Sequence, residues 1–85
     1  MNAEFTVYTC YVLSGLGLVL SGEVKSGTVA EGEIGMTAKG KRCTVVKIET
    51  KGERMHSANS RERVTLVVKH ISKDDVKPWD TLYFK

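Results

Sequence analysis

The sequence predicts an all-β fold: a small closed six-stranded Greek-key β-barrel with one short helical turn near residues 72–76. Apolar and β-branched residues alternate with polar ones and do not recur at helical spacing. Glycine-containing turns divide the chain into short segments. Closure into a barrel would remove the exposed edges that a flat sheet of this size leaves. A sandwich of two three-stranded sheets has the same periodicity and is the alternative architecture.

The first two strands are predicted around a glycine turn. Alternation over residues 5–13 predicts a strand whose odd-numbered positions share one face. Residues 14–17 contain two glycines and form the turn, and a second strand runs from Leu18 until Ser26 and Gly27 end it. Gly22 interrupts the apolar positions of that strand, which predicts a bulge or a close approach of another backbone.

Four further strands are predicted over residues 33–38, 42–49, 64–68 and 81–84. Residues 50–60 have little apolar content and are predicted to form a long loop. A single helical turn is expected after Ser72, because a serine cap and the acidic pair Asp74 and Asp75 favour a helix start. Pro78 would end that turn.

Composition favours one folded domain spanning residues 1–85. The chain is 27% charged, has a mean hydropathy of -0.18 and carries a net charge of +3. The apolar stretch from Val7 to Leu20 is broken by serine and glycine, so no membrane span or signal peptide is expected. The two cysteines, Cys10 and Cys43, form no metal or redox motif. A cytoplasmic location without membrane contact is therefore expected.

Charge is distributed unevenly along the chain. Residues 1–38 hold one lysine against four glutamates, whereas residues 39–85 hold twelve lysines and arginines against six acidic residues. The segment around the predicted strand 42–49 is a candidate contact surface for a polyanion. Its basic residues are Lys39, Lys41, Arg42, Lys47, Lys51 and Arg54. The alternative is a solvated strand face whose lysines protect an edge.

Residues 13–27 resemble the opening of the second domain of translational GTPases, as found in elongation factor Tu and its archaeal counterpart. Gly22, Val24 and Gly27 match that family's Gly-x-Val-x-x-Gly pattern. The resemblance continues through 29–32, 46–49 and 71–77 and so covers nearly the whole chain. It implies a β-barrel that acts in translation.

Two departures from the family pattern affect turns. Arg61 and Trp79 stand where the family usually has glycine. If those glycines adopt positive φ, we expect the turns here to be rebuilt, because a side chain is disfavoured in that conformation. The family's GTPase domain is also missing, since no Gly-x-x-x-x-Gly-Lys-Ser/Thr loop occurs. The chain is therefore expected to be a stand-alone domain without GTP binding or any cofactor.

The resemblance also implies a binding site. In the family, this barrel holds the aminoacylated 3′ end of tRNA, with the terminal adenosine in an apolar pocket beside a glutamate. Glu49 matches that glutamate, and Leu13, Val19 and Leu66 match pocket positions. A base can pack on aliphatic surface while the carboxylate accepts a hydrogen bond. The family's neighbouring arginine has no clear match.

No catalytic or metal-binding constellation is predicted. His56 and His70 lie at no metal-ligand spacing from a cysteine, and the Asp74–Asp75 pair fits the helix start better than a catalytic dyad. We therefore expect a non-catalytic module that binds tRNA or rRNA. The alternatives are a protein-interaction module, an accessory subunit of a separate GTPase, or a vestigial barrel. The ribosome or a GTPase is the partner expected in the first two cases. In a protein-binding role, Trp79 is the candidate contact.

Overall fold

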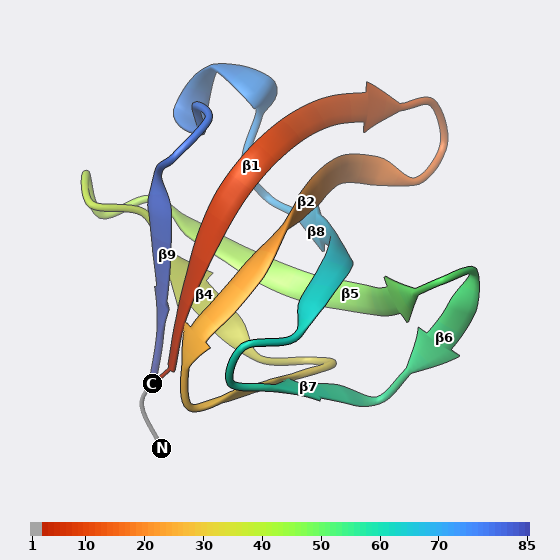
Figure 1. Ribbon diagram of the computed structural model, residues 1–85. Coiled ribbons are helices and arrows are strands. Elements are labelled where there is room, and N and C mark those ends of the chain that lie inside the picture. The colour runs from red at the N-terminus through yellow and green to blue at the C-terminus, as the bar shows by residue number, and fades with distance from the viewer. Residues whose placement is uncertain (1–2) are drawn as a thin grey trace.

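The computed structural model describes residues 3–85 as a closed antiparallel barrel (Figure 1). Six strands form the barrel wall: β1 (Ala3–Leu13), β2 (Gly17–Ser26), β4 (Ile34–Met36), β5 (Arg42–Thr50), β8 (Arg63–Lys69) and β9 (Thr81–Phe84). They are hydrogen-bonded in the order β4-β9-β1-β2-β8-β5, and the β4–β5 pair closes the ring. Because β2 to β4 and β8 to β9 skip neighbouring strands, the topology is a Greek key. The predicted barrel is confirmed, and the sandwich alternative is wrong.

Three short strands and one helical turn complete the structure. They are β3 (Thr28–Ala30), β6 (Glu53–Met55), β7 (Ser57–Asn59) and the 3-10 turn η1 (Lys73–Asp75). The β3–β7 ribbon and η1 lie at opposite ends of the barrel in Figure 1. The prediction of a loop over residues 50–60 is wrong, because β6 and β7 lie there. Strands of three residues are too short to produce an alternating pattern, and their partners on β5 and β3 define them.

The core fills the barrel interior and continues to both ends. Its largest fully buried side chains come from all parts of the wall: Phe5, Phe84, Leu20, Ile48, Leu66 and Leu82. Val29 and Ala58 extend the core beneath the β3–β7 ribbon, and Val76 extends it near η1. Cys43 is buried, and this burial raises the pKa of its thiol. Both cysteines are free thiols.

The face assigned to residues 5–13 changes partway along β1. Phe5 and Val7 are buried as expected, but Tyr11 and Leu13 are exposed. The register with β2 shifts between Val7 and Thr9, which leaves Tyr8 as an extra residue. Such a bulge reverses the alternation, because side chains on a strand have a period of two. The prediction that all odd-numbered positions share one face is therefore wrong after Val7.

Gly22 occupies a point of close backbone approach, as its position in β2 predicted. A Cβ at this position would overlap the carbonyl oxygen of Thr6 and lie 2.9 Å from the Phe5 ring. Gly22 pairs with Val7, next to the β1 bulge. The glycine therefore lets β1 and β2 approach each other where the strand bends.

The turns at Arg61 and Trp79 keep a left-handed backbone. Arg61 has a φ of 73° and Trp79 has a φ of 75°. The Arg61 N–H donates to the Val24 carbonyl at 2.6 Å, and the Trp79 N–H donates to the Val7 carbonyl at 2.6 Å. The expectation that these turns are rebuilt is wrong, because surrounding hydrogen bonds hold the strained conformation.

Replacing Arg61 with glycine is expected to stabilise the barrel by about 0.5–1 kcal/mol. Relief of left-handed strain contributes about 1–2 kcal/mol, partly offset by the greater backbone entropy of glycine in the unfolded chain. The thermal midpoint should rise by about 2–8 °C in a calorimetric scan. Arg61→Ala removes the same guanidinium but retains a Cβ, so it should give no such rise. Equal midpoints for the two variants would contradict the strain argument.

Candidate functional site

A cavity of about 330 Å³ lies on the outer surface of β2, β8 and β5. Strand register places Ser21, Thr65 and Glu49 side by side across this wall. The hydroxyl oxygens of Ser21 and Thr65 are 3.2 Å apart and form a hydrogen bond. The lining residues are Tyr8, Ser21, Gly22, Glu49, Thr50, Lys51, Arg63, Val64 and Thr65. We call this hollow the Glu49 cavity.

The Glu49 cavity combines one carboxylate with positive charge. Glu49 forms an ion pair with Lys47, with 2.8 Å between Oε2 and Nζ. Both side chains are about one-third exposed, so water competes for this pair and its contribution to stability is about 0–1 kcal/mol. Lys51 and Arg63 also line the cavity. The site therefore offers a hydrogen-bond acceptor beside cations that can attract phosphate.

An apolar row adjoins the cavity on the same outer face. Tyr11, Val19 and Val67 are direct cross-strand neighbours, and Lys47 follows on β5. Val19 is 3% exposed and Val67 is 4% exposed, whereas Tyr11 is 49% exposed. A ligand on this face would first meet the Tyr11 ring. Val19 forms part of the covered layer beneath.

Leu13 and Leu66, two of the pocket candidates from the sequence, have different environments. Leu13 is 42% exposed at the end of β1, on the same face as Tyr11, but it does not line the cavity. Leu66 is 0% exposed and packs inside the barrel. Its assignment to a surface pocket is wrong, because the outward positions of β8 are Thr65 and Val67.

The Arg54 guanidinium is hydrogen-bonded to Glu31 and not to Glu49. Its Nε donates to Glu31 at 2.9 Å, and a second nitrogen donates to the same carboxylate at 3.3 Å. The Arg54 hydrogen bonds lower the pKa of the Glu31 carboxyl, and the same pair raises the pKa of Arg54. Arg54 sits opposite Glu49 on β6 but serves as a link between that strand and Glu31.

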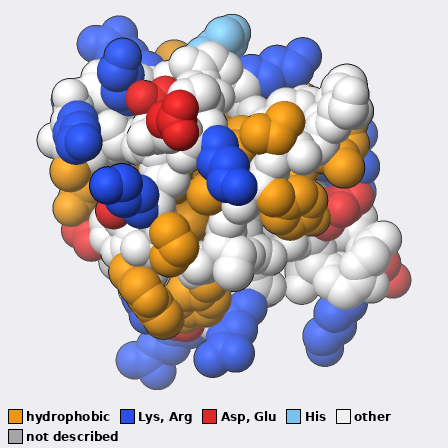
Figure 2. Space-filling view, turned by 90° about the horizontal axis from the view of Figure 1, so that it is seen from above, with side chains coloured by type: hydrophobic (Ala, Val, Ile, Leu, Met, Phe, Trp, Pro, Cys, Tyr) orange, Lys and Arg blue, Asp and Glu red, His pale blue; other side chains and the backbone are white. Residues whose placement is uncertain are grey.

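The six basic candidates do not form one surface. Arg42 begins β5 and Lys51 follows its last residue, so the full length of the strand separates them. The pKa of Asp75, the last residue of η1, is lowered mainly by the hydrogen bond from the Ser72 backbone N–H, and the nearby charges of Lys41 and Lys39 lower it further. On the face in Figure 2, lysine and arginine side chains are spread among hydrophobic ones. Strand geometry therefore divides the six residues into two groups, and a binding role for either group stays a prediction. Lys39, Lys41 and Arg42 lie at the start of β5, and Lys47, Lys51 and Arg54 lie toward or beyond its end.

Trp79 belongs to a cluster beside the Glu49 cavity. Its ring centroid is 5.2 Å from that of Tyr8, with the planes tilted by 56°. The Arg63 guanidinium carbon lies 6.0 Å from the centre of the Tyr8 ring. The Tyr8 hydroxyl donates to Glu23 at 2.6 Å, and this hydrogen bond lowers the pKa of the Glu23 carboxyl. Trp79 itself is 73% exposed.

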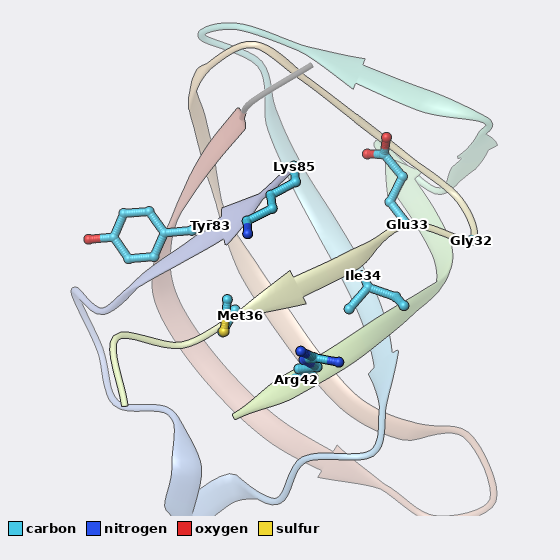
Figure 3. Close-up of a pocket in the computed structure, with 7 residues that line it drawn as sticks. All are labelled: Gly32, Glu33, Ile34, Met36, Arg42, Tyr83 and Lys85. Carbon is cyan, nitrogen blue, oxygen red and sulfur yellow. The ribbon is translucent and has the colours of Figure 1, made fainter. Parts of the chain in front are cut away.

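A second hollow of about 340 Å³ lies against β4, β5 and β9 (Figure 3). Ile34 is 57% exposed and Tyr83 is 44% exposed, and both line it together with Met36. Arg42 and Lys85 supply positive charge there. Glu33 also lines this hollow. The hollow, which we call the β4–β9 groove, therefore combines apolar surface with two cations and one carboxylate.

Sequence reasoning missed Tyr8, Ser21, Arg63 and Thr65 as cavity residues. Alternation along the chain already places Tyr8, Ser21 and Thr65 opposite the apolar positions, but only the β1–β2 and β2–β8 register shows that they lie together. Within residues 3–85, no three His, Cys, Asp or Glu side chains are close enough to hold a metal ion. No helix among the described residues has the length and hydropathy needed to cross a membrane.

Comparison with solved structures connects this barrel to translation elongation factors. A bacterial selenocysteine-specific elongation factor, EF-Sec, matches 94% of the chain with a TM-score of 0.85 and 26% identity. The elongation factor SelB from Methanococcus maripaludis, in its apo form, matches 100% of the chain with a TM-score of 0.91 and 17% identity. The chain covers 14% and 19% of those proteins, respectively. No protein-family model and no curated protein sequence matches it.

Proposed function

We propose that this chain, which has the β-barrel fold of the second domain of translation factors, is a non-catalytic module that binds RNA in the translation apparatus. Its ligand is the unpaired 3′ end of a tRNA, with the terminal adenosine in the Glu49 cavity. The observation that carries the proposal is the position of Glu49. The glutamate singled out by sequence resemblance lines a cavity of about 330 Å³ on the outer wall, where a ligand can reach it.

The chemistry of the cavity suits a nucleoside that carries a phosphate. Glu49 can accept a hydrogen bond from a ribose hydroxyl or from the adenine amine. Ser21 and Thr65 supply hydroxyl groups at the floor, and Lys51 and Arg63 can contact phosphate oxygens. The exposed Tyr11 ring on the adjacent row offers a flat surface for a base.

Glu49→Gln is expected to weaken binding of an RNA ending in 3′ adenosine by about tenfold, because the neutral amide oxygen of glutamine is a weaker acceptor than the carboxylate. The measurement is a chemical-shift titration with two short RNAs, one ending in CCA and one in CCU. Simple electrostatics predicts the opposite sign, since removing a negative charge favours a polyanion. A loss confined to the CCA RNA therefore identifies the specific contact. The melting temperature should change by only a few degrees, since the Lys47 pair is solvent-exposed.

The matched control is Glu53→Gln, which removes the same charge from the neighbouring strand β6. That variant should bind both RNAs equally well or slightly better. Contacts from Lys51 and Arg63 to two phosphates would give a slope of about -1.4 in log affinity against log salt. A flat salt titration, or no preference of the native protein for CCA, would contradict adenosine recognition.

Protein binding is the second candidate function, and the β4–β9 groove favours it. Apolar surface from Ile34 and Tyr83 beside Arg42 and Lys85 fits a partner segment with apolar and acidic side chains. Nuclease treatment separates the two functions. A partner held by this groove stays bound after nuclease, whereas one bridged by RNA is released.

A further inference from the structure

Trp79 combines an unfavourable backbone with an exposed side chain. Its φ of 75° is disfavoured for any residue with a Cβ. Trp79 is 73% exposed, so burial of its side chain offsets little of the free-energy cost of this backbone conformation. Backbone hydrogen bonds fix the turn: Trp79 N–H donates to Val7, and Asp80 N–H donates to Lys77 at 3.0 Å. A strained conformation that presents a large aromatic ring to solvent points to a binding role.

The Trp79 ring is held by a neighbouring ring that is itself anchored. Tyr8 projects from the bulge of β1, and its hydroxyl donates to Glu23 at 2.6 Å. Trp79 packs against Tyr8 at 5.2 Å between centroids. Tyr8 and Arg63 also line the Glu49 cavity. A continuous strip thus leads from Glu49 past Arg63 and Tyr8 to Trp79, and we call this strip the aromatic platform.

We propose that the aromatic platform stacks an unpaired base of a single-stranded RNA whose 3′ end occupies the Glu49 cavity. This inference rests on the proposed function. In it, Trp79 contacts a nucleotide that precedes the terminal adenosine in the RNA. An exposed indole offers a flat π-face that any base can use, and Arg63 places a cation 6.0 Å from the centre of the neighbouring Tyr8 ring. Lys25, Lys47, Lys51 and Arg63 outnumber the carboxylates of Glu23 and Glu49 around the cavity, although Arg63 lies 3.9 Å from Glu23. The excess of positive charge favours an anionic chain over a neutral peptide.

Trp79 is the single tryptophan of the sequence, so its fluorescence reports directly on the platform. The protein is titrated with adenosine monophosphate, with the trinucleotide CCA and with a hexanucleotide ending in CCA. Quenching is expected with the hexanucleotide, and not with the mononucleotide, because only a longer strand extends past the cavity. Chemical shifts of Glu49 and Thr65 report separately on cavity occupation by each ligand.

Trp79→Gly removes the ring and suits the left-handed backbone, so it tests stacking without adding strain. Affinity for the hexanucleotide should fall about 5- to 150-fold, the range for loss of one stacked base. Affinity for adenosine monophosphate should not change. Trp79→Phe keeps a ring at the same backbone conformation and should retain most of the hexanucleotide affinity. Circular dichroism of each variant confirms that the barrel is folded.

The possible outcomes test base stacking on the aromatic platform and adenosine binding in the Glu49 cavity independently. If the mononucleotide binds at Glu49 but Trp79→Gly leaves hexanucleotide affinity unchanged, the platform is wrong and the proposed function stands. If the hexanucleotide quenches Trp79 with no preference for a 3′ adenosine, the platform stands and adenosine recognition fails. If no RNA alters the fluorescence, the platform is wrong. A protein partner that quenches Trp79 in the absence of RNA would then assign the ring to protein contact.

Discussion

Gly22→Ala is expected to destabilise the barrel by about 3 kcal/mol or more, at the upper end of the range for overpacked sites. The added methyl group would overlap the Thr6 carbonyl oxygen and press on the Phe5 ring at 2.9 Å. The carbonyl belongs to the β1 backbone, so relief requires separating the two strands that share the longest pairing in the barrel. Urea denaturation followed by circular dichroism measures the loss as a lower midpoint.

Gly40→Ala is the matched control for this substitution. A Cβ at Gly40 would meet nothing within 4 Å, although the φ of 87° disfavours a side chain. It should therefore lose about 1–2 kcal/mol from backbone strain alone. If Gly22→Ala is no more destabilising than Gly40→Ala, β1 and β2 do not approach each other as described.

Leu66→Ala should lower the free energy of unfolding by about 2–5 kcal/mol, because the side chain fills the barrel interior. Removing it leaves a cavity among Leu20, Ile48 and their neighbours in the core, and such a cavity collapses only partly. The same denaturation experiment measures this loss. The total stability of a domain this size is about 5–15 kcal/mol, so the variant is measured at low temperature to keep it folded.

Leu13→Ala is the comparison, because Leu13 is the other leucine that sequence assigned to the pocket. Its side chain is 42% exposed, so the loss should stay below about 1 kcal/mol. If Leu66 faced a ligand as the sequence suggested, Leu66→Ala would weaken RNA binding and leave stability nearly intact. That pattern would contradict the orientation of β8.

Local sequence patterns were sufficient to predict the strands of the barrel wall, because these strands carry alternating apolar residues and end at turns. Each of the six predicted strands overlaps one of the six strands of the barrel wall, and Gly22 was recognised from its break in the apolar pattern. The short strands β3 and β7 were missed because they are defined by pairing with each other across a long stretch of sequence. β6 forms a tight hairpin with β5, but its three residues are too few to show an alternating pattern. The turns at Arg61 and Trp79 were misjudged for a related reason. Hydrogen bonds to Val24 and Val7 hold a backbone that local preference opposes.

The candidate site depended even more on tertiary structure. Sequence resemblance identified Glu49, and its carboxylate does line an outer cavity. The resemblance could not place Leu66, because a register shift of one residue decides which side of a strand faces the core. Nor could charge along the chain locate a surface, since the full length of β5 separates Arg42 from Lys51.

The sequence by itself determined an all-β chain, the positions of its main strands and the choice of Glu49. Alternation and glycine turns are local properties, and they act on the chain before any long-range contact forms. Only the tertiary structure decided that Tyr8, Arg63 and Trp79 lie together beside Glu49. The physical reason is the pairing of β1 with β2 and of β2 with β8, together with the hydrogen bond from the Trp79 N–H to Val7, which bring residues from distant segments onto one wall.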